Sequence, residues 1–149
     1  MINWTFEAGL QTSADIVQVA TDSKKIYDLF SNGNAVMTSS SHLSGTDRVN
    51  EAVSKIGLSD QDVIINIQGD EPFINPEDIN NLFDLVSKEE IEMGTLYSDL
   101  KSLDELEDSN KVKILVNDGI ASNFFRETSL VDNIFIHQGV YAFKYKTLK

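Results

Sequence analysis

The stretch VIINIQGDEPFINPED, residues 63–78, constrains the fold more than any other part of the chain. Its first seven residues are almost all apolar, which predicts a β-strand covered on both faces. Asn75 is a suitable helix cap, Pro76 suits a first helical turn, and the two acidic residues that follow favour the positive end of a helix dipole. A buried strand followed by a helix predicts an α/β sheet.

Strand and helix patterns alternate along the first part of the chain, and strand patterns then cluster. In chain order, we expect helices at 2–10, from 23, from about 46 to 57, from 76 and at 102–108, and strands at 15–21, 35–39, 63–69, 93–98, 112–117, 122–126 and 134–143. In the helix from 76, we expect the apolar residues Ile79, Leu82, Phe83 and Val86 to face inward. This order predicts an α/β layered sheet with a mixed edge.

Composition limits the partners that the protein can bind. A chain of 149 residues suits one domain, and 12 Lys and Arg against 24 Asp and Glu give a formal net charge of −12. Because this charge repels phosphate backbones and anionic lipid, neither nucleic acid nor a membrane surface is an expected partner. With no cysteine, no basic and apolar leader and no long apolar run, we expect a cytoplasmic protein.

The first candidate site is Gly69-Asp70-Glu71-Pro72, where the central strand ends. In open α/β sheets, ligands bind beyond the carboxyl ends of the strands. Gly69 allows backbone to approach a ligand, and a carboxylate such as that of Asp70 can hold Mg²⁺. The alternative interpretation is an ordinary polar turn after a strand.

The second candidate site is HLSGTDR, residues 42–48, just before a predicted helix. Hydroxyl groups and exposed amides at a helix N-terminus can bind a phosphate or a nucleobase. Alternatively, Ser44 or Thr46 is only the helix cap, and Arg48 is a solvated residue of the first turn.

The third candidate site consists of Arg126, His137 and Tyr141, near the ends of predicted strands. Arg126 is suited to bidentate binding of a carboxylate. A single His or Tyr in an apolar strand is more often a structural residue. No phosphate-binding loop, dinucleotide fingerprint, zinc motif or nucleophile elbow is present.

Five segments together resemble a known family. They are ATD (20–22), HLSGTDRVNEAV (42–53), VIINIQGDEPFI (63–74), NKVKILVNDGIASNFFR (110–126) and HQGVYAFKYKTL (137–148). In this order and spacing they closely resemble the CMP-Kdo synthetases, the 3-deoxy-D-manno-octulosonate (Kdo) cytidylyltransferases of bacterial lipopolysaccharide synthesis. The resemblance implies a three-layer nucleotidyltransferase fold, Rossmann-like and similar to the glycosyltransferase-A fold, with a mixed sheet. It also implies that the 2-hydroxyl of Kdo attacks the α-phosphate of CTP, which releases pyrophosphate and forms CMP-Kdo.

The resemblance also implies roles for the candidate residues. Asp70 matches the catalytic carboxylate that holds Mg²⁺. The nucleotide-binding residues correspond to Ser44, Gly45, Thr46, Arg48 and Gln68. The sugar-acid pocket corresponds to Arg126, His137 and Tyr141, and Arg126 also has a catalytic role.

The chain departs from the family pattern at both ends. Family members begin with a strand and a loop of the kind PARxxSxRLPGKP, which binds the triphosphate, and they end with a helical segment that forms a homodimer and a second metal-binding Asp. Neither is matched here, so we expect residues 1–149 to be a single, incomplete cytidylyltransferase domain without its first strand. That strand belongs between those at 15–21 and 63–69. ETSL at 127–130 also replaces an expected S-P-I-P-like continuation.

Other functions remain as alternatives. A CMP-sialic acid synthetase-like enzyme would use another 2-keto sugar acid on the same fold. A non-catalytic remnant would bind nucleotide without turnover. A flavodoxin-like signalling domain would also have an acidic strand end, but it does not explain why SGTDR and QGDEP occur together.

Overall fold

The apolar stretch forms β3 (Val63–Ile67), and α4 (Pro76–Val86) follows it, as predicted. The Asn75 side chain caps α4 by accepting a hydrogen bond of 3.0 Å from the Glu77 amide. Three of the four apolar residues predicted to face inward on α4 are buried. Phe83 borders a cavity next to β3 and is 40% exposed, so it is not part of the buried core.

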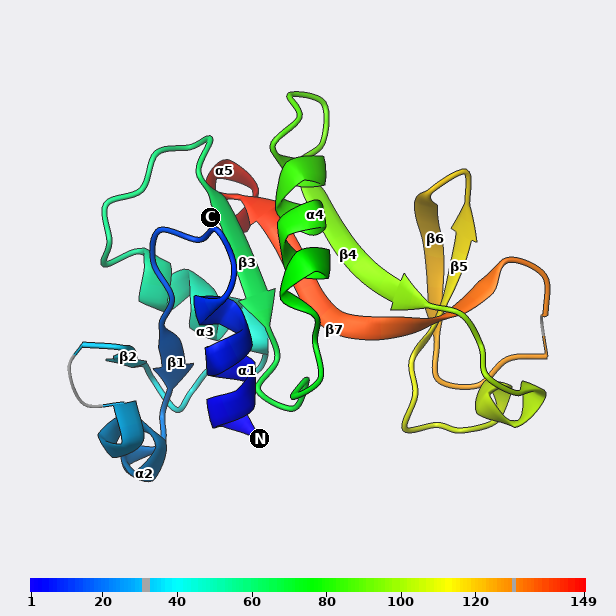
Figure 1. Ribbon diagram of the computed structural model, residues 1–149, viewed down its shortest axis with the longest axis horizontal. Helices are drawn as coiled ribbons and strands as arrows, with labels where there is room; N and C mark the ends of the chain where they lie inside the picture. The colour runs from blue at the N-terminus through cyan, green and yellow to red at the C-terminus, as the bar shows by residue number, and fades with distance from the viewer. Residues whose placement is uncertain (31–32, 130) are drawn as a thin grey trace. The chain divides into compact units, whose positions relative to one another are not determined.

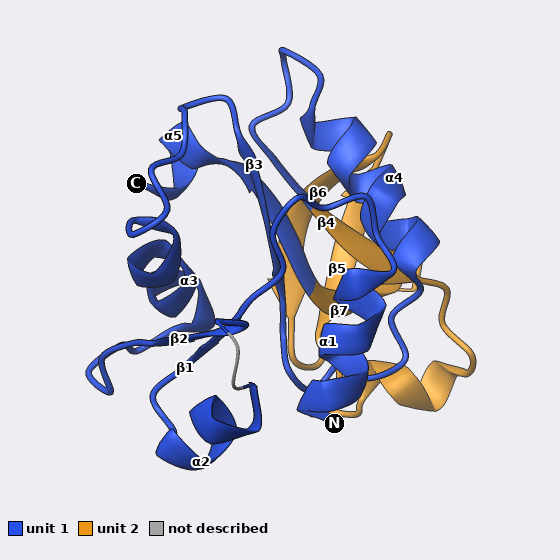
Figure 2. Ribbon diagram, turned by 60° about the vertical axis from the view of Figure 1, so that its left-hand side comes forward, with its two compact units in different colours: residues 1–94, 140–149 blue, residues 95–139 orange. Residues whose placement is uncertain are grey.

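The computed structural model describes residues 1–30, 33–129 and 131–149, which form two compact units (Figures 1 and 2). Residues 1–94 and 140–149 make the first unit, and residues 95–139 make the second. Besides β3 and α4, the first unit contains α1 (Ile2–Leu10), β1 (Val19–Thr21), α2 (Lys24–Tyr27), β2 (Ala35–Met37), α3 (Gly45–Val53) and α5 (Tyr145–Leu148). Two further strands, β4 (Met93–Ser98) and β7 (Ile134–Lys144), belong to both units. No helix among these residues is long and apolar enough to cross a membrane.

Layers form around β3 in the first unit. Figure 2 shows α3 on one side of β3, and α1 and α4 on the other. β3 pairs antiparallel with β7 over its whole length. One core cluster joins α3, β3, β7 and α5 through Val53, Ile64, Phe143 and Leu148. Parallel and antiparallel pairs occur together, which confirms the predicted mixed α/β class.

A cavity separates β1 from β3. β1 pairs in parallel with β2 through only three residues, so the strand predicted at 15–21 is shorter than expected. β1 and β3 point the same way in Figure 1 but do not pair with each other in the part of the chain that the structure describes. The cavity between them has a volume of about 1030 Å³ and is also bordered by residues of α1, α3 and α4.

The second unit is built on a β-hairpin of β5 (Lys113–Asn117) and β6 (Ile120–Phe125). Asp118 and Gly119 form its turn with φ angles of 50° and 76°, as a two-residue turn of this hand requires. β6 therefore begins two residues before the predicted 122. The helix predicted at 102–108 is a 3-10 helix, Leu103–Leu106. Leu130 of the ETSL segment lies outside the described residues.

Candidate functional site

Ser44 caps the N-terminus of α3. Its Oγ accepts a hydrogen bond of 3.1 Å from the Asp47 amide and donates one of 2.7 Å to Asp47 Oδ2. The interpretation of Ser44 as a helix cap is therefore confirmed, and its contact with nucleotide stays a prediction. α3 ends at Val53, four residues before the predicted end, and Gly57, at a φ of 78°, marks the later reversal of the chain.

Arg48 connects α3 to the ends of β1 and β2. Its Nη2 donates a hydrogen bond of 3.0 Å to Asp22 Oδ2, just after β1. Its Nη1 donates to Thr38 Oγ1 at 2.8 Å and to the Ser39 carbonyl at 3.3 Å, just after β2. The alternative that Arg48 is merely solvated is wrong, because three protein acceptors hold its guanidinium. Asp22 lies in the ATD segment of the family resemblance, but no sequence pattern predicted this ion pair.

Glu51, one turn further along α3, holds the segment before the helix. Its Oε2 accepts a hydrogen bond of 2.8 Å from the Ser39 amide and lies 2.5 Å from His42 Nε2. Its Oε1 accepts from Lys55 Nζ at 3.0 Å. The Ser39 amide, then His42 and Lys55, lower the pKa of Glu51 to about 2. The carboxylate is thus ionised at neutral pH. The spacing Arg48-x-x-Glu51 places both side chains on one face of the helix. This spacing was the sequence signal that Glu51 could act together with Arg48.

The end of β3 exposes the side chains of Gln68 and Asp70. The Gly69 carbonyl accepts a hydrogen bond of 3.3 Å from Thr5 Oγ1 of α1, and the Glu71 amide donates one of 3.0 Å to the Gln68 carbonyl. Any Cβ on Gly69 would lie 3.0 Å from the Ile2 side chain. The turn that presents Asp70 is thus fixed against α1.

Three of the five predicted nucleotide-binding residues, together with Gly69, border the cavity between β1 and β3. Gly45 and Arg48 border it from α3, and Gln68 and Gly69 border it from the end of β3. Segments at 42–48 and 63–70, far apart in the sequence, therefore meet in one part of the first unit. Ser44, Thr46 and Asp70 do not border this cavity.

Arg126 and His137 belong to the second unit. Arg126 is exposed just after β6, and its Nη1 donates a hydrogen bond of 3.3 Å to the Ser109 carbonyl. His137 Nε2 lies 2.9 Å from Thr95 Oγ1, and the edge of the ring meets Phe124 at a centroid distance of 5.2 Å. Burial lowers the pKa of His137, so the imidazole is neutral near pH 7.

Tyr141 lies on the part of β7 that belongs to the first unit. It packs against the core cluster and stacks on Phe143 with centroids 6.3 Å apart. Burial raises the pKa of its hydroxyl. These contacts support a structural role, and a role in binding sugar stays a prediction.

Asp70 fits a magnesium site of one particular kind. Nowhere in the described ranges do three His, Asp or Glu side chains converge, so these residues form no site with three such ligands. Mg²⁺ often keeps several water ligands and binds through one or two carboxylates and the phosphates of a substrate. A single exposed carboxylate at a strand end suits that arrangement.

Comparisons with known proteins agree with this geometry. A 3-deoxy-manno-octulosonate cytidylyltransferase from Francisella tularensis subsp. novicida is 32% identical over 100% of this chain and 66% of its own length. The Haemophilus influenzae protein of the same name is 34% identical over 97% of this chain and 65% of its own length. The chain thus spans slightly less than two thirds of these relatives.

A solved structure of CMP:2-keto-3-deoxy-manno-octonic acid synthetase complexed with CTP matches with a TM-score of 0.85 and 31% identity. The match covers 99% of this chain and 64% of that one. The predicted nucleotidyltransferase fold and the resemblance to CMP-Kdo synthetases are confirmed. The family model described as cytidylyltransferase matches residues 1–144. The chain belongs to the cytidylyltransferase family.

Proposed function

We propose that this chain forms the nucleotide- and sugar-binding core of a cytidylyltransferase that activates Kdo. The 2-hydroxyl oxygen of the sugar attacks the α-phosphate of CTP, the bond between the α- and β-phosphates breaks, and pyrophosphate leaves. One observation carries this proposal: the SGTDR segment at the start of α3 and the QGDEP segment at the end of β3, far apart in the sequence, come together in a chain of this family. The relatives' own name describes the same transfer.

Residues at the start of α3 and the end of β3 would bind the nucleotide. Ser44, Gly45 and Thr46 lie where the amides of a helix N-terminus favour an anion. Gln68 can offer both a donor and an acceptor to a nucleobase. Arg48 would bind the nucleotide without moving, because its existing hydrogen bonds hold the guanidinium in place.

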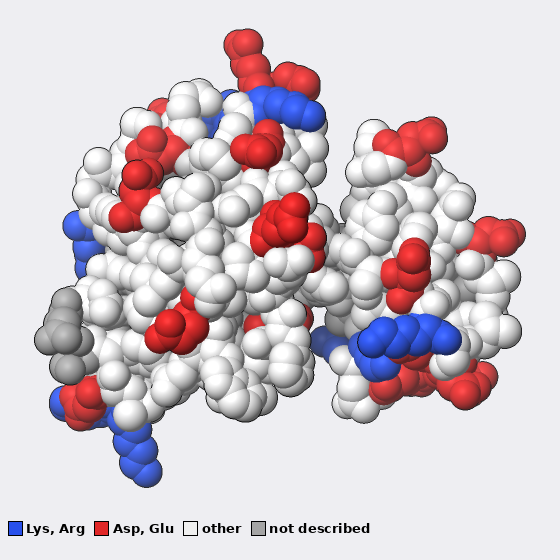
Figure 3. Space-filling model, viewed as in Figure 1, with Lys and Arg blue, Asp and Glu red and all other residues white. Residues whose placement is uncertain are grey.

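Asp70 would hold Mg²⁺, which supplies charge neutralisation on the phosphates. The protein has a formal net charge of −12, and acidic side chains are spread over the face shown in Figure 3. This charge opposes the approach of CTP. Binding of CTP should therefore depend strongly on the divalent cation.

Arg126 would bind the carboxylate of the sugar acid through its planar guanidinium, and it would align the 2-hydroxyl for attack. His137, neutral and held by Thr95, would contribute a hydrogen bond to a sugar hydroxyl. Tyr141 would contribute its hydroxyl group to binding of the sugar acid.

Calorimetry with CTP and Mg²⁺, followed by pyrophosphate release with Kdo or N-acetylneuraminic acid, tests the proposal. We expect CTP to bind only with the cation, and pyrophosphate release with Kdo to exceed that with the sialic acid. The opposite preference would favour a CMP-sialic acid synthetase. CTP binding without release would indicate a non-catalytic nucleotide-binding chain, and absence of both would refute the proposal.

A further inference from the structure

Lys113 is a completely buried lysine whose ammonium group is held by backbone carbonyl groups. Its side chain is 0% exposed, at the start of β5. Nζ donates hydrogen bonds to the carbonyl of Asp108 at 2.6 Å, to that of Lys111 at 2.9 Å and to that of Arg126. An ammonium group has three donors, so all three are used. A buried cation is costly without such partners, which marks this as a built site.

The three carbonyl groups come from two separate segments of the second unit. Asp108 and Lys111 belong to the turn before β5, and Arg126 follows β6. The same turn also holds the Arg126 side chain, because Nη1 donates to the Ser109 carbonyl at 3.3 Å. Lys113 therefore fixes the backbone of Arg126 and the turn on which its guanidinium rests.

The turn itself has further internal support. The Asp108 carboxylate accepts hydrogen bonds of 3.0 and 3.1 Å from the amide and the side chain of Asn110. Lys111 Nζ lies 2.5 Å from Glu105 Oε1. With the turn this well defined, the link through Lys113 determines where Arg126 lies relative to it.

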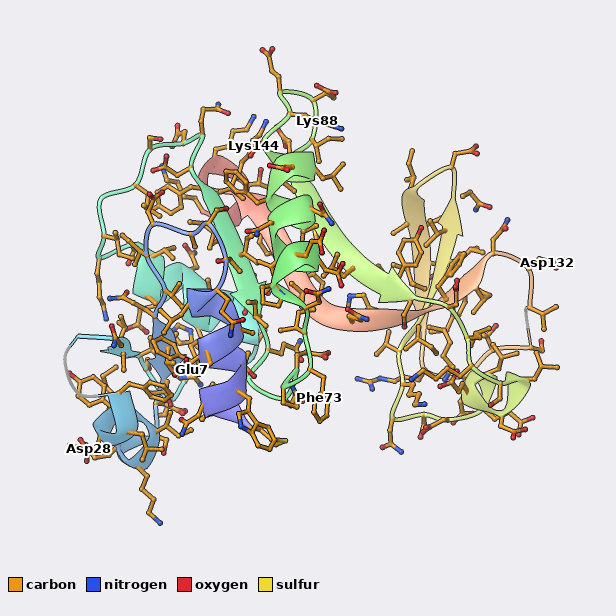
Figure 4. All side chains as sticks on the ribbon, viewed as in Figure 1. Glu7, Asp28, Phe73, Lys88, Asp132 and Lys144 are labelled. Carbon is orange, nitrogen blue, oxygen red and sulfur yellow. The ribbon has the colours of Figure 1, made fainter. Side chains whose placement is uncertain are left out.

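Lys144 offers a matched comparison in the first unit. It is 2% exposed, and its Nζ donates to the carbonyl groups of Lys88 at 2.7 Å and Glu89 at 2.8 Å. Figure 4 labels Lys144 and Lys88, near the end of α4. Both lysines thus have the same burial and the same kind of partner, but the hydrogen bonds of Lys144 reach no predicted site residue.

We propose that Lys113 is a positioning residue that holds Arg126 in the geometry that binds the carboxylate of the substrate. This inference rests on the proposed function, because it assigns that carboxylate to Arg126. The side chain of Lys113 is enclosed and does not contact substrate. It acts through the Arg126 carbonyl and the turn at 108–111.

Four variants of the chain test this: Lys113→Met, Lys144→Met, Arg126→Gln and the double variant Lys113→Met/Arg126→Gln. Calorimetry gives the Kd values for Kdo and for CTP with Mg²⁺, and amide hydrogen exchange follows residues 108–111 and 126–128. We expect Lys113→Met to weaken Kdo binding about tenfold or more, to leave the Kd for CTP unchanged and to speed exchange in both segments. Lys144→Met should do neither, and the double variant should bind Kdo no more weakly than Arg126→Gln.

The outcomes separate the two proposals. Unchanged Kdo binding in Arg126→Gln would refute the role given to Arg126, and with it this inference. Weaker binding in Arg126→Gln but not in Lys113→Met, or an equal loss in Lys144→Met, would overturn the inference alone. If Lys113→Met does not fold, Lys113→Gln, which keeps two donors, replaces it. Full Kdo affinity in that variant, with faster exchange at 108–111, would also overturn it.

Discussion

Ser44 caps a helix and is also predicted to bind nucleotide, and comparison with a second helix cap can separate these two roles. Its hydroxyl caps α3 through the Asp47 amide, and the resemblance also places it in the nucleotide site. Asn75 caps α4 with the same kind of bond, from the Glu77 amide at 3.0 Å, and has no predicted role in binding. The two caps therefore make a matched pair.

The expected stability losses follow from the loss of a capping bond. Replacement of a capping Ser or Asn by Ala costs about 1 kcal/mol, which lowers Tm by roughly 2–4 °C in a protein of this size. Ser44→Gly should cost only a few tenths of a kcal/mol, because glycine is tolerated at the cap. Loss of one hydrogen bond to nucleotide costs about 1 kcal/mol, or about fivefold in Kd.

Urea denaturation gives the stability, and calorimetry with CTP and Mg²⁺ gives the Kd. Ser44→Ala and Asn75→Ala should lose similar stability, while only the two Ser44 variants should bind CTP about fivefold more weakly. Equal Kd values in Ser44→Gly, Asn75→Ala and the unchanged chain would show that Ser44 serves only as a cap.

Three further predictions concern stability, pH and metal. Gly94→Ala should lower the free energy of unfolding by about 1–3 kcal/mol in urea melts, because the new Cβ would lie 2.9 Å from Leu82 and 3.1 Å from Val86, both buried; a stable variant would contradict this packing. The pKa of Glu51 falls from 4.5 to about 2 on folding, so the stability that this carboxylate contributes is complete above about pH 4.5 and lost as pH falls towards 2. Glu51→Gln should therefore flatten the pH profile of the free energy of unfolding between these values. An unchanged profile would refute the hydrogen bonds assigned to Glu51. Asp70→Asn should abolish the CTP binding that Mg²⁺ supports without changing the melt, because Asp70 is exposed; retained binding with Mg²⁺ would place the metal elsewhere.

Local chemistry made part of this structure predictable. Asn75 and Pro76 define the start of α4 by capping and fixed backbone geometry, and both act within one turn of the chain. The run at 63–67 also specified a strand, although only its alternate residues, Ile64 and Asn66, are buried. Asp118-Gly119 was an equally strong turn signal, and its neglect moved the predicted start of β6 by two residues.

Contacts between distant residues were not predictable from pattern. Arg48 meets Asp22 across 26 positions, and only the fold decides that α3 lies beside the end of β1. Lys113 lies in VKILVN, where a lysine suggests a solvated strand face, yet it is enclosed by three carbonyl groups. The burial expected for Phe83 was not found for a related reason: the apolar stripe of a helix does not show that a cavity lies beside it.

The hydrogen bonds between α3 and the segment before it have a consequence for local unfolding. Arg48 and Glu51 stand three residues apart and both hold Ser39, one through its carbonyl and the other through its amide. Because one helix carries both bonds, rotation or fraying of α3 would release them together. Residues 38–53 should therefore exchange their amide protons as one cooperative unit, and a bound nucleotide should slow that exchange across the whole unit at once.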